Sequence, residues 1–184
     1  REVEAIVQVV RDFNDPNVIR AGSVDPENDV GTINTELVLA DIQSLDKRLE
    51  KLRSAARGTK DSETLKKLEV ALKLKETLDS GALASSLDLS DEELILSKDL
   101  NLLTQKPMIY ILNTDEGTLN TEVPRNEYLH SENTIQVCAK IEEELGGFSS
   151  EERKEYLSDM GISETGLDKI IKAGYELLGL DTYL

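Results

Sequence analysis

The most informative stretch of this chain is Lys106-Pro-Met-Ile-Tyr-Ile-Leu-Asn-Thr-Asp-Glu116. Within it, Met108 to Leu112 form an unbroken apolar run of mostly β-branched, aromatic and leucine residues, which is typical of a strand buried on both faces of a parallel sheet. The polar residues Asn113 to Glu116 follow at once, where the carboxyl edge of the sheet is expected. Ligands of open α/β sheets bind at that edge, so these residues are candidate ligand contacts.

The same pattern recurs further along the chain. Thr134-Ile-Gln-Val-Cys138 predicts a short strand, and Ala139 and Lys140 come directly after it. A strand that ends in Asn-x-x-acid, followed by one that ends in Ser/Cys-Ala-Lys, is typical of the base-recognition half of a P-loop nucleotide-binding domain. The first motif alone is more simply a turn after a strand, but the ordered pair predicts a nucleotide site.

Along its whole length the chain resembles the YchF/Obg-like ATPase family, a translation-factor-related branch of the P-loop proteins. The matching stretches are Val3–Arg11, Ile33–Asp41, Leu103–Pro107, Asn113–Glu116, Val137–Lys140 and Ile171–Leu178. The resemblance implies an α/β fold, a partial P-loop NTPase (Ras-like) parallel sheet domain with an inserted antiparallel α-helical hairpin. It also implies a fragment, because the family's phosphate loop and switches would lie upstream of Arg1 and its C-terminal domain beyond Leu184.

The resemblance also implies which residues hold the nucleotide. Asn113 would hydrogen-bond the base and Thr114 would pack against it, while the Cys138 loop would contact its other side through backbone N–H groups and the Lys140 stem. The predicted nucleotide-binding residues are Asn113, Thr114, Glu116, Cys138, Ala139 and Lys140. Asp115 receives no assigned role.

The identity of the base is predicted from Glu116. GTP-binding relatives use Asn-Lys-x-Asp, because the Asp accepts both N–H donors of guanine, whereas adenine places a ring acceptor beside its amine and repels such a carboxylate. Here Glu116 is one methylene longer than Asp and Thr114 replaces the Lys. Both changes disfavour GTP, so ATP with Mg²⁺ is the expected cofactor of the complete protein.

Catalytic residues are not assigned within this chain. The sequence contains no G-x-x-x-x-G-K-[ST] phosphate loop, which phosphoryl transfer requires together with Mg²⁺. We therefore expect the parent protein to hydrolyse ATP and this polypeptide alone to be inactive. No metal-ligand cluster stands out, Cys138 is expected to be a small buried apolar residue, and His130 is expected to be solvated.

The sheet domain is predicted in two parts, 1–36 and 103–184, with a helical insertion over 37–102. After a buried central strand over 5–10 and a loop over 11–32, a first helix is expected to begin near Asn34. It carries a coiled-coil seam of Val38, Ile42, Leu45, Leu49, Leu52 and Ala56.

A second helix over 61–79 would complete an antiparallel hairpin with the first. Its predicted apolar stripe is broad and consists of Leu65, Leu68, Ala71, Leu72, Leu74 and Leu78. A third helix is expected over 90–102 and begins with a capping box of Ser90 and Glu93.

The remaining helices are predicted after the second strand. A short helix is expected around Glu127, a further one after Lys140, and another over 149–160. A last helix over 167–178 is expected to pack against the sheet through Leu167, Ile170, Ile171, Gly174, Leu177 and Leu178.

Charge divides the chain unevenly. The net charge of −16 argues against general binding of nucleic acid or anionic membranes, but residues 43–79 carry ten Lys/Arg against seven Asp/Glu, which is +3 and leaves −19 for the rest. A solvated helix surface explains this most simply, and the alternative is docking to the ribosome or RNA, which the resemblance implies. The candidate contacts are Lys47, Arg48, Lys51, Arg53, Arg57, Lys66, Lys67, Lys73 and Lys75, with the tip at 57–60 reaching farthest.

The composition of the sequence indicates in which cellular compartment the protein is expected. A single cysteine rules out an internal disulfide, and no signal peptide or apolar run of about 20 residues is present, so a cytoplasmic protein without a membrane partner is expected. Three interpretations of function remain open. They are an ATP-preferring regulatory ATPase of the YchF type associated with the ribosome, a non-enzymatic helical adaptor, and a true GTPase of the Obg-related group.

Overall fold

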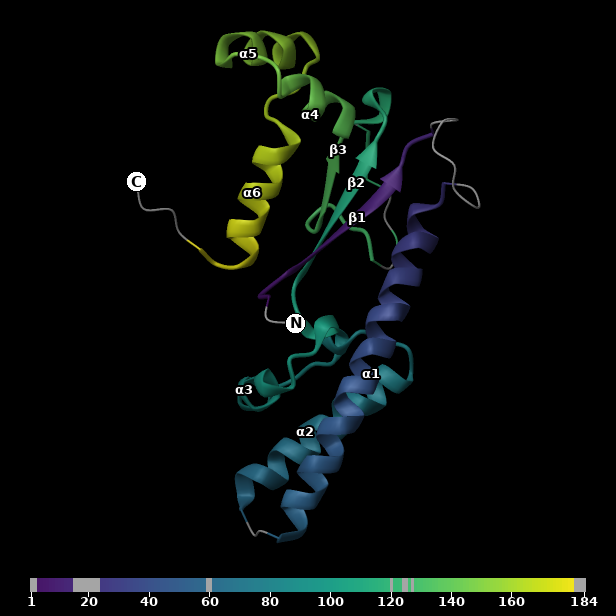
Figure 1. The fold of residues 1–184 in the computed structure, drawn as a ribbon, viewed down its shortest axis with the longest axis vertical. Helices are drawn as coiled ribbons and strands as arrows, with labels where there is room; N and C mark the ends of the chain where they lie inside the picture. The colour runs from purple at the N-terminus through teal and green to yellow at the C-terminus, as the bar shows by residue number, and fades with distance from the viewer. Residues whose placement is uncertain are drawn as a thin grey trace. The chain divides into compact units, whose positions relative to one another are not determined.

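The computed structural model describes residues 3–14, 24–58, 61–119, 121–123, 126 and 128–180. These residues form a three-stranded sheet and six α-helices (Figure 1), which confirms the predicted α/β class. The strands β1 (Ile6–Asp12), β2 (Met108–Thr114) and β3 (Thr134–Val137) lie in the order β1-β2-β3. β2 and β3 are parallel, with Asn113 opposite Val137, so both strands end at the same edge of the sheet.

β2 is the buried central strand. The strand that was predicted over 5–10 to be buried and central is β1, which lies at the edge of the described sheet, with Val7 and Val9 49% and 65% exposed. Residues 109–112 of β2 are all at most 7% exposed, as the apolar run predicted. Tyr110 and Leu112 pack in one cluster with Val10 of β1, and Val30 and Leu129 complete that cluster. The strand continues through Asn113 and Thr114, two residues beyond the predicted apolar run, so it carries the first polar residues itself.

Helix α1 (Pro26–Gly58) begins well before the predicted start near Asn34, so the loop predicted over 11–32 is wrong from Pro26 onward. The Asp25 side chain accepts a hydrogen bond from the backbone N–H of Asn28 at 3.1 Å, and Pro26 occupies the first helical position. Asp-Pro at this place is therefore a helix start and not a turn. Burial of the Val30 side chain, which is fully buried, stabilises this first turn of the helix.

Helix α2 (Ser62–Asp79) packs against α1 to form the predicted hairpin. Asp61 caps it by accepting hydrogen bonds from the N–H groups of Glu63 and Thr64, and Gly81, in the left-handed region at φ 86°, follows its end. The apolar core between the two helices includes Val38, Leu45, Leu49, Val70, Ala71, Leu74 and Leu78. Residues 59 and 60 of the predicted tip lie outside the described residues.

The broad apolar stripe predicted for α2 is wrong at two positions. Leu65 and Leu72 are 48% and 41% exposed, whereas Val70 is buried. At about 100° per residue, Leu65 and Leu72 project roughly a quarter turn or more away from Ala71 and Leu74, which face the core. Leucine content alone therefore overestimated the width of the buried face.

Helix α3 (Asp91–Ser97) is shorter than the predicted 90–102. The capping box is present, with the Ser90 side chain and the Glu93 side chain each bonded to the other residue's backbone. The chain leaves the α-helical path through a 3₁₀ turn over 98–100 and then Asn101, which adopts a left-handed φ of 49°. Asn tolerates that conformation better than most residues, so it ends the helical stretch.

The C-terminal helices are α4 (Ala139–Leu145), α5 (Ser150–Asp159) and α6 (Gly166–Leu177). Gly166 opens α6 beside β3, and a Cβ there would lie 2.6 Å from a methyl carbon of Val137, so only glycine allows this approach. The prediction for α6 is wrong for Leu167, Ile171 and Leu178, which are 58%, 48% and 39% exposed. Ile170 and Leu177 are half-buried, so the apolar stripe of α6 is wider than its buried face. The helix predicted around Glu127 lies outside the described residues.

The chain divides into two compact units. The first contains Arg1–Ile6 and Gly31–Pro107, and the second contains Val7–Val30 and Met108–Leu184. The helical hairpin therefore lies in the first unit, while β2, β3 and the helices that follow lie in the second. The domain bounds 1–36, 37–102 and 103–184 stay a prediction. None of the helices described is long and apolar enough to cross a membrane.

Candidate functional site

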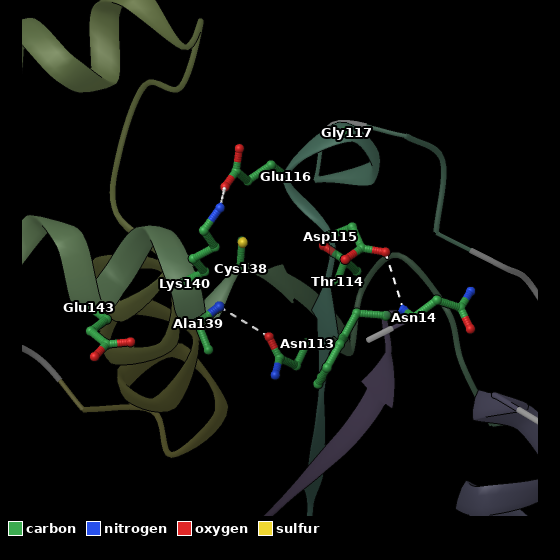
Figure 2. A pocket seen from close by; sticks show the side chains of 11 residues that line it. Asn14, Asn113, Thr114, Asp115, Glu116, Gly117, Cys138, Ala139, Lys140 and Glu143 are labelled. Atoms are coloured by element: carbon green, nitrogen blue, oxygen red, sulfur yellow. Dashed lines mark hydrogen bonds and ion pairs between the residues drawn. The ribbon is translucent and has the colours of Figure 1, made fainter. Parts of the chain in front are cut away.

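A pocket of about 590 Å³ lies at the carboxyl edge of β2 and β3 (Figure 2). Each strand delivers one loop to it, because parallel neighbours end at the same edge. All six residues that the sequence predicted as nucleotide contacts line this pocket, namely Asn113, Thr114, Glu116, Cys138, Ala139 and Lys140. The structure thus brings the two motifs together, and their role in binding stays a prediction.

Asn113 joins the two loops. Its side-chain Oδ1 accepts a hydrogen bond from the backbone N–H of Ala139 at 3.0 Å (Figure 2). This bond fixes the orientation of the amide, and the Nδ2 group has no hydrogen-bond partner among the described residues. Since an amide nitrogen carries two N–H donors, Asn113 can donate to an acceptor on a ligand in the pocket.

An ion pair connects the same two loops at a second point. Lys140 Nζ lies 2.6 Å from Glu116 Oε1, and the two side chains are 69% and 40% exposed. The hydrogen bond and the negative charge of Glu116 raise the pKa of Lys140. Lys140 is therefore charged at neutral pH and offsets the negative charge of the Glu116 carboxylate.

Thr114 and Cys138 form the deeper wall of the pocket. They are 2% and 4% exposed, so each offers a ligand only a small surface. The Thr114 hydroxyl is buried without a hydrogen-bond partner among the described residues.

Five lining residues were not among the predicted contacts, namely Phe13, Asn14, Asp115, Gly117 and Glu143. Phe13 and Asn14 follow β1 directly, so the rule about carboxyl edges of strands could have found them. Asp115, which had no assigned role, accepts a hydrogen bond from the backbone N–H of Asn14 at 3.3 Å. Burial, and then the nearby charge of Asp115, raise the pKa of Asp12.

The described part of the chain holds no group of three or more His, Cys, Asp or Glu side chains arranged to bind a metal ion. His130 is exposed, as expected.

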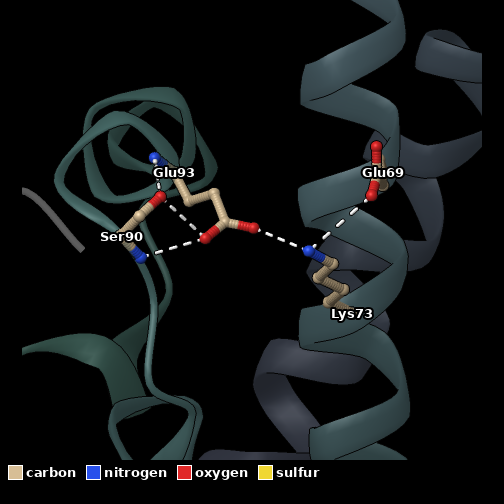
Figure 3. A network of polar contacts seen from close by, with 4 residues as sticks. All are labelled: Glu69, Lys73, Ser90 and Glu93. Carbon is tan, nitrogen blue, oxygen red and sulfur yellow. Dashed lines mark hydrogen bonds and ion pairs between the residues drawn. The ribbon is translucent and has the colours of Figure 1, made fainter.

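The lysines of α2 are engaged in ion pairs, three of them with acidic residues of the segment 92–99. Figure 3 shows one such contact, in which Lys73 Nζ lies 2.7 Å from Glu93 Oε1. The hydrogen bond from Lys73, followed by those from Ser90, lowers the pKa of Glu93 to about 2. The other pairs are Lys73 with Glu69, Lys66 with Glu92, Lys67 with Glu63 and Asp99, and Lys75 with Asp46 and Asp79.

The cations of α1 differ from those of α2. Among the described residues no ion pair involves Lys47, Arg48, Lys51, Arg53 or Arg57, and all of these except the half-buried Arg48 are exposed. The basic character found in the sequence is therefore available mainly on α1. We refer to these five residues as the α1 basic stripe.

Comparison with known proteins gives a consistent result. The chain is 42% identical over 192 residues to the ribosome-binding ATPase YchF of Bacillus subtilis (strain 168), and 39% identical over 189 residues to that of Haemophilus influenzae. Each alignment covers 100% of this chain and 52% of the relative, so the chain spans about half the length of these curated relatives. The solved structure of the Schizosaccharomyces pombe YchF GTPase matches 96% of this chain and 50% of its own, with a TM-score of 0.79 at 30% identity. No family model matches the chain.

Proposed function

Since this chain belongs to the YchF family, we propose that its pocket holds the purine base of a nucleotide, with ATP preferred to GTP. The observation that carries the proposal is the hydrogen bond between Asn113 Oδ1 and the Ala139 N–H, which links the two loops and leaves the Asn113 Nδ2 group available. We further propose that the complete protein hydrolyses ATP with Mg²⁺. No residue of this chain is assigned to the phosphates or to Mg²⁺.

The donors of Asn113 suit any purine. Both adenine and guanine carry an acceptor at N7, so a hydrogen bond from Nδ2 to N7 would hold either base. Asn113 therefore supplies affinity and not selectivity. The selection of adenine falls to the residues that face the other edge of the base, where the two purines differ.

In the proposed site, Glu116 is the residue that faces the edge at which adenine and guanine differ. A free carboxylate at this position would accept from the two N–H donors of guanine and would face the ring acceptor of adenine. In this chain the carboxylate has the longer Glu stem and is bonded to Lys140. Both features support ATP over GTP.

The proposal is tested by calorimetric titration of the complete protein that contains this chain with Mg-ATP and with Mg-GTP. ATP is expected to bind more tightly than GTP. Asn113→Ala should weaken both nucleotides by about tenfold or more, because a lost hydrogen bond costs roughly 1–3 kcal/mol. Gln43→Ala, which removes an exposed amide on α1, is the control and should leave both affinities unchanged.

Unchanged affinities in a folded Asn113→Ala variant would refute the proposed site. Equal affinities of the unmutated protein for ATP and GTP would instead support the interpretation as a GTPase.

We also propose that the α1 basic stripe contacts the ribosome. The relatives are named ribosome-binding, and five cations without an ion pair among the described residues on one helix suit a surface rich in phosphate. The lysines of α2 are less suited, because carboxylates already neutralise them. A contact with ribosomes also agrees with a cytoplasmic location.

A further inference from the structure

The ion pair between Glu116 and Lys140 has a consequence beyond joining two loops. Glu116 belongs to the short 3₁₀ helix Glu116–Thr118 after β2, and Lys140 belongs to the first turn of α4 after β3. Both side chains line the pocket, and Figure 2 shows them extending toward each other. In the proposed binding mode, the carboxylate and the ammonium group would face the Watson–Crick edge of the base.

The pair controls what Glu116 offers to a ligand. A carboxylate is useful to guanine only when its oxygens are available to the ring N–H and the exocyclic amine. With Lys140 Nζ bonded to Oε1 at 2.6 Å, one of those oxygens already accepts a strong donor and its negative charge is compensated. Adenine does not donate two hydrogen bonds to this carboxylate, so the ion pair should not weaken the binding of ATP.

We propose that Lys140 is a specificity-determining residue, which disfavours guanine by holding the carboxylate of Glu116 in an ion pair. The inference rests on the proposed function, since it assumes that a purine base occupies this pocket. It assigns Lys140 a role different from stacking its stem on the base. It also explains how a chain can keep an acidic residue at the position that selects guanine and still prefer ATP.

The pair is suited to such a role because it is exposed and not a rigid structural link. Exposed ion pairs contribute little to stability, so its removal should leave the fold intact. Neither side chain belongs to a buried cluster of the second unit. A change in selectivity on removing Lys140 would therefore not reflect a loss of structure.

The test measures the ratio of the dissociation constants of GTP and ATP for the complete protein and three variants. Lys140→Gln should lower this ratio at least fivefold, mainly by tightening GTP, because the freed carboxylate can then bind guanine. Glu116→Gln combined with Lys140→Gln should cancel this effect and bring the ratio back to within about twofold of the unmutated value, because no carboxylate remains.

Lys172→Gln is the matched control, because it breaks a similarly exposed pair with Glu164, and neither of these residues lines the pocket. The inference is overturned if Lys140→Gln leaves the ratio within twofold, or if the double variant keeps the lowered ratio. If Asn113→Ala still weakens both nucleotides in that case, the proposed base site survives and only the role of Lys140 fails. If the unmutated protein binds neither nucleotide, both fail.

Discussion

Asp41 shows how a single buried charge can fix the base of the helical hairpin. Its side chain is fully buried, and its carboxylate accepts hydrogen bonds from the backbone N–H groups of Leu103 and Thr104 and from the Thr104 hydroxyl, at 2.7–2.9 Å. The same hydroxyl accepts a hydrogen bond from the N–H of Ala84 at 3.1 Å. One carboxylate therefore ties α1 to two turns that follow the hairpin.

We predict that Asp41→Asn lowers the free energy of unfolding by about 3 kcal/mol. The substitution removes the charge and turns an amide N–H₂ toward groups that are themselves donors, and hydrogen bonds to charged groups are worth about 1.5–3 kcal/mol each. Urea unfolding monitored by circular dichroism measures the loss. Asp46→Asn on the same helix is the control and should cost less than about 1 kcal/mol, because Asp46 is exposed and 3.6 Å from Lys75. Equal losses in the two variants would show that burial of Asp41 is not the cause.

The sequence did not predict the burial of Asp41. The residue lies next to the apolar seam of α1, where an acidic side chain is usually solvated, and its partners lie 62 and 63 residues further along the chain. By contrast, the capping box of Ser90 and Glu93 could be identified, because its donors and acceptors lie within three residues of each other. A hydrogen bond between residues close in the sequence can be predicted from the sequence, whereas a polar contact between distant segments cannot.

At the scale of elements, the sequence located both helices of the hairpin but misjudged where α1 begins and how wide the buried face of α2 is. The start of α1 was missed because Asp25-Pro26 suits a turn and a helix start equally well, and the burial of Val30 decides between them. The width of the apolar stripes on α2 and α6 was overestimated, because leucine and isoleucine residues also occur on exposed faces. Periodicity identifies the helix, and only the packing shows which side is buried.

The described cations of residues 43–79 lie on two helices, α1 and α2, and this difference in position leads to a prediction about ribosome binding. One variant of the complete protein replaces Lys47, Lys51, Arg53 and Arg57 of α1 by Gln, and a second replaces Lys66, Lys67, Lys73 and Lys75 of α2 by Gln. Each removes four positive charges, so a difference between them reflects position and not net charge. The α1 variant should lower the affinity for ribosomes about tenfold or more near 0.1 M salt, and should reduce the dependence of log affinity on log salt by about 3.

The α2 variant should keep most of the affinity, because carboxylates already neutralise its lysines. Co-sedimentation with ribosomes at two salt concentrations measures both effects, and ATP binding checks that each variant is folded. If the two variants lose affinity equally, the free cations of α1 have no special role. If neither variant loses affinity for ribosomes, the positive charge of residues 43–79 serves only to solvate the helices.

At the scale of the whole molecule, the resemblance read from the sequence agrees with the comparisons. Two loops separated by more than twenty residues meet at one pocket, as expected for adjacent parallel strands that end together. What remained hidden was the state of each charge, namely that Glu116 is bonded to Lys140 and that the lysines of α2 have partners. Ion pairs depend on how side chains of separate elements approach one another, which a list of residue types does not reveal.

The central claim is that a purine base occupies the pocket at the carboxyl edge of β2 and β3. Nuclear magnetic resonance of the complete protein, labelled with ¹⁵N and titrated with Mg-ATP, tests it most directly, because each backbone amide reports on its own surroundings. The account predicts that the amide signals of residues 113–117 and 138–140 shift as ATP is added, with Ala139 among them. It would be contradicted if these signals stayed in place under saturating ATP, while those of residues 131–135 and Ala173, which line a separate groove beside α6, shifted instead.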